Sequence, residues 1–193
     1  ENFGTSMSTP IVAGLVALVQ QYFNDGYYPT GVAGANPLVP MGAALKALIV
    51  ISGQYLTGAG ANGANSATFP NYNQGFGFVH MAFMADPDTS LYVDGDYAAM
   101  PTAVAVNDTF TYTFEINNGT APGTEFRIVL CWHDPPAITD ATGLLLINDL
   151  DLVVAADDGT MYYPNFGSPV GDHINNVERV VVAADPGAIY TAT

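Results

Sequence analysis

The protein has 193 residues, of which 49% are hydrophobic and only 11% are charged. This apolar content is sufficient for a packed core and argues against a disordered chain. The 18 acidic residues outnumber the 3 basic ones, so the formal net charge is -15. Binding to nucleic acid or docking onto anionic lipid requires clustered Lys and Arg, and we expect neither. No apolar run reaches the ~20 residues of a membrane span, so we expect no such segment.

The charge is unevenly distributed along the chain, and this step predicts two domains. Residues 1–85 contain two acidic residues and one lysine, whereas residues 86–193 hold the other 16 acidic residues and both arginines. We therefore expect one domain at 1–85 and another at 86–193. The segment 86–89 (Asp-Pro-Asp-Thr) reads as a linker turn between them.

Two apolar helices are predicted in the first domain. One covers residues 10–23 and begins at Pro10, which suits a first helical turn because its missing N–H is not needed there. The other covers residues 41–52 and ends at Gly53. Helices that are apolar on almost every face are buried, so we expect them to pack on a further element, most simply a sheet. Residues 24–40 and 57–65 are predicted loops, and residues 76–83 a short strand or extended segment.

The second domain has the pattern of an all-β fold. Its apolar residues alternate with polar ones or form short runs, and turn residues separate these runs. We expect strands at 109–116, 126–132, 150–155, 161–163, 177–183 and 188–192, with turns at 117–119 and 157–159. Strands this short predict a β-sandwich or jelly roll. The single cysteine, Cys131, is expected as a buried apolar residue in a strand rather than as a reactive thiol.

Residues 4–10 (Gly-Thr-Ser-Met-Ser-Thr-Pro) stand directly before the first predicted helix. A serine at the start of a helix has a free backbone N–H that can donate to a developing oxyanion. The helix dipole adds positive potential at the same place. Gly4 allows a substrate backbone to approach closely. The alternative is that the Ser and Thr residues only cap the helix, which is a common role.

This string resembles the nucleophile motif of the subtilases, the subtilisin-like serine proteases, usually written Gly-Thr-Ser-Met-(Ala or Ser)-x-Pro. The resemblance implies that Ser6 is the catalytic nucleophile and that its N–H forms half of the oxyanion hole. It also implies that residues 1–85 are the C-terminal portion of a subtilisin-like α/β catalytic domain, whose helix packs on a parallel sheet. Residues 73–79 (Asn-Gln-Gly-Phe-Gly-Phe-Val) resemble the segment that closes this domain, although Phe78 and His80 depart from the residues common there.

In subtilases the catalytic residues follow the chain order Asp, His, Ser. Because Ser6 lies almost at the start of this chain, the resemblance implies that the Asp, the His and the oxyanion Asn lie on upstream polypeptide. The chain's own histidines, His80, His133 and His173, are expected at the surface or at strand ends rather than as the catalytic base. We therefore expect this chain by itself to be inactive.

The second domain resembles the jelly-roll domain that follows the catalytic domain in one group of bacterial-type subtilases, which is similar to the P domain of the convertases. The matching strings are residues 130–135 (Leu-Cys-Trp-His-Asp-Pro), 147–152 (Ile-Asn-Asp-Leu-Asp-Leu), 159–162 (Gly-Thr-Met-Tyr) and 175–178 (Asn-Asn-Val-Glu). Asn148, Asp149, Asp151 and Glu178 could ligate a structural calcium ion, which prefers oxygen donors. The alternative is that these side chains hydrogen-bond backbone amides at turns and strand ends.

Together these features predict a mixed fold, in which a C-terminal fragment of a subtilisin-like α/β domain precedes a β-sandwich domain. The predicted function is that of a secreted serine endopeptidase, which cleaves protein or peptide substrates through an acyl-enzyme at Ser6. No cofactor or metal is required for that chemistry. The alternative function is that of a non-catalytic extracellular structural or adhesive protein built on a subtilase-like fold.

Overall fold

The computed structural model describes residues 4–56, 70–71, 73–84, 89–95, 105–138, 143, 145–165 and 167–193. The chain forms two compact units. Unit 1 comprises Glu1–Ala64 and Phe76–Thr102, and unit 2 comprises Asn65–Gly75 and Ala103–Thr193. Of the linker turn expected at 86–89 only Thr89 is described, and the loop expected at 57–65 lies outside the described residues. The two domains at 1–85 and 86–193 stay a prediction.

Helix α1 (Thr5–Asn24) confirms the first predicted helix but begins earlier than Pro10. Ser6 therefore lies in the first helical turn, and Pro10 lies inside the helix. Pro10 has no N–H to donate to the carbonyl of Ser6, one turn before it. The start of α1 is instead held by Gly4, whose carbonyl accepts the N–H of Met7 at 3.0 Å.

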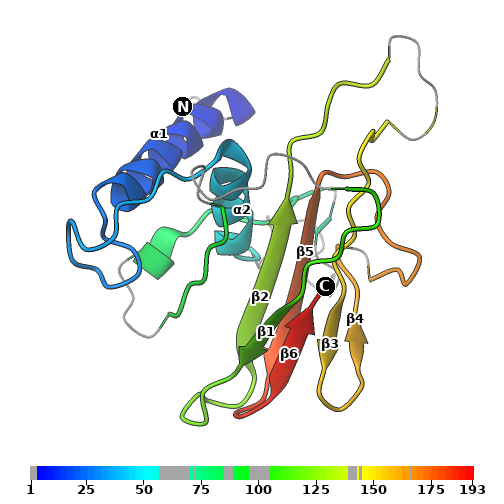
Figure 1. Ribbon diagram of the computed structural model, residues 1–193. Coiled ribbons are helices and arrows are strands. Elements are labelled where there is room, and N and C mark those ends of the chain that lie inside the picture. The colour runs from blue at the N-terminus through cyan, green and yellow to red at the C-terminus, as the bar shows by residue number, and fades with distance from the viewer. Residues whose placement is uncertain are drawn as a thin grey trace. The chain divides into compact units, whose positions relative to one another are not determined.

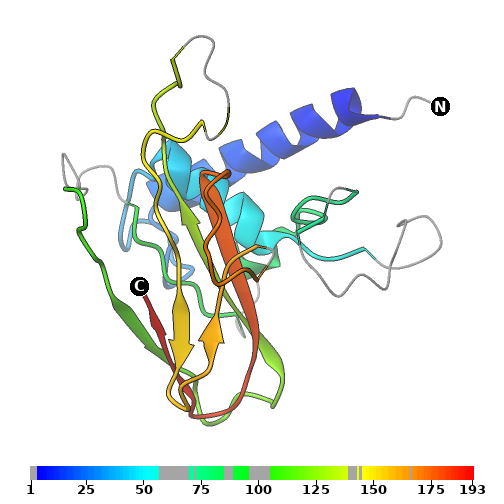
Figure 2. The same ribbon diagram turned by 90° about the vertical axis from the view of Figure 1, so that its right-hand side faces the viewer.

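Only the C-terminal half of α1 is packed in the described structure. Val19 and Phe23 are fully buried, whereas Met7, Ile11 and Leu18 expose 50%, 65% and 56% of their surface. Figure 2 shows the N-terminal half of α1, in dark blue, extending beyond helix α2 (Gly42–Ser52, in cyan). In the described structure α1 is therefore not buried on every face, and the further element expected to cover it stays a prediction. In the part of unit 1 that is described, no strand covers it.

Unit 1 has a small core between α1, α2 and the 3-10 helix η2 (Met81–Met84). The buried members of this core are Val19, Phe23, Leu38 and Leu48. Leu91 and Val93 pack against it, and the Tyr28 hydroxyl holds their backbone in place. That hydroxyl donates to the carbonyl of Leu91 at 3.2 Å and accepts the N–H of Val93 at 3.1 Å.

The remaining predictions for the first domain are confirmed in part. Helix α2 ends at Gly53 as expected, although Gly53 has φ -59 and does not adopt the left-handed conformation. Residues 25–40 form turns and irregular structure, as expected for a loop, while Asn24 still belongs to α1. In the segment 76–83, Phe78 pairs with Gln54 through backbone hydrogen bonds of 2.8 and 2.7 Å, but the chain then enters η2 instead of remaining extended.

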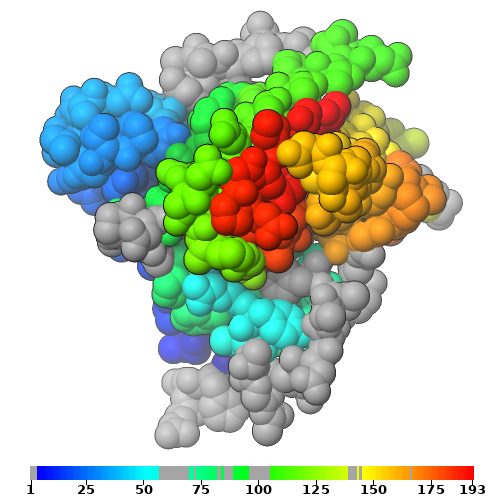
Figure 3. Space-filling model, turned by 90° about the horizontal axis from the view of Figure 1, so that it is seen from below, coloured from blue at the N-terminus to red at the C-terminus, as the bar shows by residue number. Residues whose placement is uncertain are grey.

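Unit 2 contains two antiparallel sheets among its described residues (Figure 1). The larger sheet has the strand order β1 (Tyr112–Glu115), β6 (Ile189–Ala192), β3 (Val154–Ala156) and β4 (Met161–Tyr162). Figure 3 shows β6, in red, between β1 and β3. The smaller sheet pairs β2 (Thr124–Cys131) with β5 (Val177–Ala184). Each predicted strand is confirmed, with its ends shifted.

One hydrophobic core is shared by the two sheets. Its buried members are Leu152, Val154, Val180, Val182, Ala184, Tyr190 and Ala192. The ring of Phe126 on β2 lies 5.5 Å from that of Phe114 on β1 and 5.1 Å from that of Tyr190 on β6. On β1 half-buried and exposed residues alternate, because successive side chains of a strand point to opposite faces. The mixed helical and β character is thus confirmed, whereas the jelly-roll topology and the subtilisin-like fold stay predictions.

The two predicted turns form but have different consequences. At 157–159 the chain turns from β3 into β4, and these strands pair directly, with Val154 opposite Tyr162. At 117–119 the N–H of Gly119 donates to Oδ1 of Asn117 at 2.8 Å. This second turn leads from β1 to β2, which belong to different sheets, so it is not the turn of a hairpin.

Candidate active site

Ser6 lies in the exposed first turn of α1, and its hydroxyl is free. The neighbouring hydroxyls bond back to the helix, since Thr9 Oγ1 donates to the Thr5 carbonyl at 2.7 Å and Ser8 Oγ donates to it at 3.3 Å. Among the described residues, no hydrogen bond involves Ser6 Oγ. The side chain of Ser6 is therefore available to a reactant.

The helix start itself is not closed by a side chain. Its N-cap residue is Gly4, with φ 137 and ψ 173, and no side-chain capping bond forms. The alternative in which these Ser and Thr residues cap the helix is therefore wrong for α1. A φ of 137 is also one that residues with a side chain rarely adopt, which explains why Gly stands there.

The backbone of this first turn can stabilise a negative charge. The N–H groups at the start of a helix have no carbonyl partner within it, and the N–H of Ser6 is one of these. The first turn contains no acidic residue that would occupy these donors. The dipole of a 20-residue helix adds positive potential at this end. The free N–H groups and the positive potential would stabilise an oxyanion formed next to Ser6.

The three histidines lie elsewhere. The Nδ1 atom of His80 is 3.1 Å from Nε2 of Gln54 in unit 1, and His133 is exposed in unit 2. His173 Nδ1 lies 2.6 Å from Oδ2 of Asp149 in unit 2. None of them forms a hydrogen bond with Ser6 in the described structure, and the expectation that they are not its base stays a prediction.

The pair of His173 and Asp149 was not anticipated from the sequence. The hydrogen bond and the negative charge of Asp149 raise the pKa of His173. The two residues are 24 positions apart and lie in different loops, so no local pattern links them. No described serine, threonine or cysteine is hydrogen-bonded to this imidazole, and the pair therefore gives no second nucleophilic site.

The structure brings only some of the candidate calcium ligands near one another. Glu178 on β5 is fully buried, and its Oε2 accepts the N–H of Leu152 at 2.5 Å. Among the described residues its Oε1 has no hydrogen-bond partner. Burial, together with the negative charges of Asp151, Asp172 and Asp149, raises the pKa of Glu178 to about 7, against the effect of the Leu152 hydrogen bond. These carboxylates are thus near enough to repel one another.

The other members of this region are engaged with one another. Asp134 accepts the N–H groups of Ile147 and Asn148, both at 2.7 Å, and Nδ2 of Asn148 at 3.0 Å. The side chains of Asn148 and Asp149 thus bond other side chains, those of Asp134 and His173, and of the candidate ligands it is Glu178 that bonds a backbone amide as the alternative expects. Across the residues that are described, no three His, Cys, Asp or Glu side chains converge closely enough to hold a metal ion.

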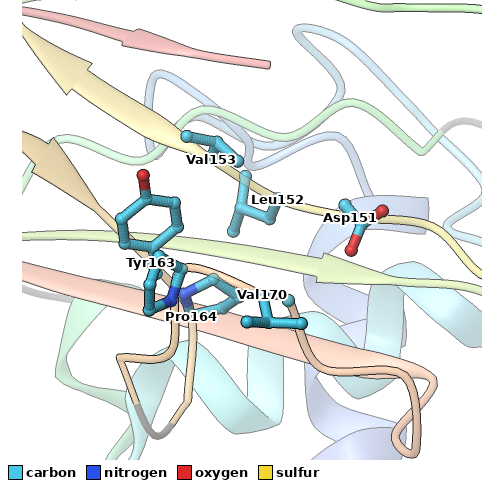
Figure 4. A pocket seen from close by; sticks show the side chains of 8 residues that line it. Asp151, Leu152, Val153, Tyr163, Pro164 and Val170 are labelled. Carbon is cyan, nitrogen blue, oxygen red and sulfur yellow. The ribbon is translucent and has the colours of Figure 1, made fainter.

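A shallow hollow of about 230 Å³ lies on unit 2 beside this region. Figure 4 shows Asp151 at one end of it, Tyr163 at the other and Leu152 between them. Its remaining lining is mostly apolar, from Val153, Pro164, Pro169 and Val170. Neither Ser6 nor a histidine lines this hollow. Cys131 is a partly buried residue of β2 that forms no disulfide, which is close to the expected buried position.

The chain is similar to curated proteins of Dictyostelium discoideum, while no protein-family model matches it. The Serine protease/ABC transporter B family proteins tagD, tagB and tagA are 30%, 29% and 23% identical to it over 92%, 98% and 97% of this chain. The chain spans only 12%, 12% and 11% of their lengths. It is therefore related to a part of proteins whose names include serine protease. In the described structure, no helix is both long and apolar enough to cross a membrane.

Proposed function

We propose that this chain is part of a subtilisin-like serine endopeptidase and that Ser6 is its nucleophile. The observation that carries the proposal is the string 4–10 at the exposed start of α1, where the Ser6 hydroxyl is free and Gly4 leaves the approach open. The words serine protease in the names of the relatives also support the proposal.

The chemistry divides between this chain and other polypeptide. Ser6 Oγ attacks the scissile carbonyl, and an imidazole outside this chain takes its proton. The N–H of Ser6 donates to the oxyanion, together with an Asn side chain that this chain does not supply. A carboxylate from the same outside polypeptide orients the imidazole. Protein or peptide substrates and a position on the extracellular side belong to the same proposal.

The names of the relatives combine a serine protease with an ABC transporter, and the sequence favours the serine protease for this chain. A nucleotide-binding P-loop requires a Gly-Lys pair within a Gly-rich loop. The chain has a single lysine, Lys46, and Leu45 precedes it. No P-loop can therefore form, and we assign this chain to the serine protease rather than to the ABC transporter.

A structural calcium ion near Glu178 is a further part of the proposal. The unpartnered Oε1 of Glu178 supports it, because a buried carboxylate oxygen normally has a hydrogen bond or a cation. Oxygen donors such as Asp151 suit calcium. The described carboxylates would have to move closer together to share the ion. Its role would be to stabilise unit 2, since Ser6 chemistry needs no metal.

An active-site label tests the nucleophile. The natural protein that contains this chain is treated with a fluorophosphonate probe, which reacts with an activated serine. We expect labelling of the wild type and its loss in Ser6→Ala. Ser8→Ala is the matched control, because it removes a hydroxyl in the same turn at a motif position where Ala also occurs. It is expected to keep the label.

Two results would contradict the proposal. One is the absence of labelling in a wild-type protein that is folded. The other is labelling that Ser6→Ala leaves unchanged. The first result would favour the alternative of a non-catalytic extracellular structural or adhesive protein, and the second would assign the reactive serine to another position.

A further inference from the structure

Two short segments of unit 2 have the sequence Asn-x-Thr, which is the acceptor sequence for N-linked glycosylation when x is not Pro. They are residues 107–109 (Asn-Asp-Thr) and 118–120 (Asn-Gly-Thr). The first stands before strand β1 and the second follows it. The two acceptor sequences thus lie at opposite ends of the same strand.

Both asparagines lie in exposed turns. Asn107 has φ 67 in a turn that Asp108 holds, since Asp108 Oδ2 accepts the N–H of Ala105 at 2.7 Å. Asn118 lies in the turn held by Asn117 and rests against the backbone of Gly187. A side chain on Gly187 would come within 2.6 Å of Asn118 Oδ1.

The side-chain amides of these asparagines are available. In the described structure neither Asn107 nor Asn118 uses its amide in a hydrogen bond. The hydroxyls of Thr109 and Thr120, two positions further on, form none either. Nothing in the fold therefore has to be broken for a glycan to be attached at either position.

The strand between the two asparagines has an open edge. Among the described strands β1 pairs only with β6, so no described strand covers its other edge. An exposed edge favours association with other chains unless charge, Pro or a cover prevents it. The sequence of β1, Tyr-Thr-Phe-Glu, carries a single charge.

The surroundings of this edge are apolar as well. Val106 exposes 92% of its surface and Phe110 exposes 49%, and both lie in the segment that leads into β1. Exposed apolar side chains beside an open strand edge are a predicted site of aggregation. A cover for this edge is therefore needed in a folded, monomeric protein.

We propose that Asn107 and Asn118 are N-glycosylated and that their two glycans flank and shield the open edge of β1. In the transfer, Nδ2 of each asparagine loses a proton and bonds to the anomeric carbon of an oligosaccharide. The bond from that carbon to a lipid diphosphate breaks, and the lipid diphosphate leaves. The donor is thus a lipid diphosphate-linked oligosaccharide of the secretory pathway. This proposal rests on the extracellular position proposed above and not on the chemistry of Ser6.

Intact mass measurement tests the modification. The full chain is secreted from a eukaryotic host with an added C-terminal Asn-Gly-Thr sequence, whose glycosylation reports passage through the pathway. Asn107→Gln and Asn118→Gln remove one acceptor each, and Thr109→Ala and Thr120→Ala do so without changing the asparagine. Thr111→Ala, at an exposed threonine outside both sequences, is the matched control.

We expect two glycans in addition to that on the added sequence, one in each acceptor variant and two in the Thr111→Ala control. Treatment with peptide-N-glycosidase removes them and leaves Asp at each modified position. If the added sequence is modified while Asn107 or Asn118 is not, the proposal is overturned.

Light scattering tests the shielding. The variant that combines Asn107→Gln and Asn118→Gln is compared with the glycosylated wild type, after fluorescence of the buried Trp132 has shown that unit 2 is folded. We expect the variant to self-associate at a several-fold lower concentration. Equal self-association of the two proteins would overturn the shielding role.

Discussion

Glu178 is a carboxyl group of unit 2 whose pKa is strongly raised. Replacing it with Gln tests the environment that the structure describes for it. The side chain is fully buried on β5, where one oxygen accepts the N–H of Leu152 and the other has no partner. Glu178→Gln keeps the size of the side chain and a carbonyl oxygen for Leu152, and removes only the ability to ionise.

The magnitude follows from the shift in pKa. Burial, with the charges of Asp151, Asp172 and Asp149, raises the pKa of Glu178 from 4.5 to about 7. The folded state therefore binds a proton that the unfolded state has released between these two values, and stability falls as the pH rises through this window. Between pH 5 and pH 8 the loss in free energy of unfolding from this group is about 2 to 3 kcal/mol. Glu178→Gln removes this loss.

The assay is urea unfolding at pH 5 and at pH 8 in the presence of a chelator. Trp132 is the only tryptophan, lies buried in unit 2 and donates from Nε1 to the carbonyl of Asn148, so its fluorescence reports unfolding of this unit. We expect wild type and Glu178→Gln to differ little at pH 5, and the variant to be more stable by about 2 to 3 kcal/mol at pH 8. Glu115→Gln, at an exposed glutamate of β1, is the matched control.

A second group acts in the same direction and must be separated from Glu178. Asp149 raises the pKa of His173, so the stability that this pair contributes is present below the ordinary histidine pKa and is lost as the pH rises through the raised one. The wild-type slope therefore contains both effects, and only the difference between wild type and Glu178→Gln isolates the glutamate. If that difference is the same at pH 5 and pH 8, the described environment of Glu178 is wrong.

Three further predictions concern unit 2, each read from the Trp132 urea transition. Asp172→Asn is expected to lower the free energy of unfolding by about 2 kcal/mol at pH 7. The reason is that the buried carboxylate accepts Nδ2 of Asn165 at 2.5 Å and Nδ2 of Asn175 at 2.8 Å. An unchanged transition would contradict this hydrogen-bond network. Val154→Ala, at a fully buried site, is expected to lower the free energy of unfolding by roughly 2 kcal/mol. Val181→Ala, at a site that is 38% exposed, is expected to lower it by less than about 1 kcal/mol. Equal losses would contradict the described core. Millimolar calcium is expected to raise the midpoint of the wild type at pH 8 and not that of Glu178→Gln, and a midpoint unaffected by calcium would refute the structural ion.

The acid limb of the stability profile has a different origin. Burial by itself raises the pKa of Asp172, but its hydrogen bonds from Asn165, Asn175 and the N–H of Ile174 outweigh this effect, and its pKa is lowered. The stability that this group contributes is therefore present above the ordinary aspartate pKa and is lost as the pH falls through the lowered one. Unit 2 is thus expected to be most stable between the two windows.

The sequence by itself was sufficient for the local elements. Helices α1 and α2 and the strands of unit 2 lie where apolar periodicity and turn residues placed them, because these patterns depend on the geometry of one element alone. The same holds for Ser6, whose position at a helix start follows from the residues around it. Its role as a nucleophile is still a prediction, which the labelling experiment tests.

The contacts between distant segments were decided only by the tertiary structure. The partition of β1 and β2 into different sheets, the burial of Glu178 and the pairing of His173 with Asp149 all join residues far apart in the chain. The sequence contains no local signal for such contacts, because they depend on how the sheets and loops pack. For the same reason α1, apolar along its length, leaves Met7, Ile11 and Leu18 exposed. The apolar composition of α1 predicts that these side chains are buried, and only packing against other segments can bury them.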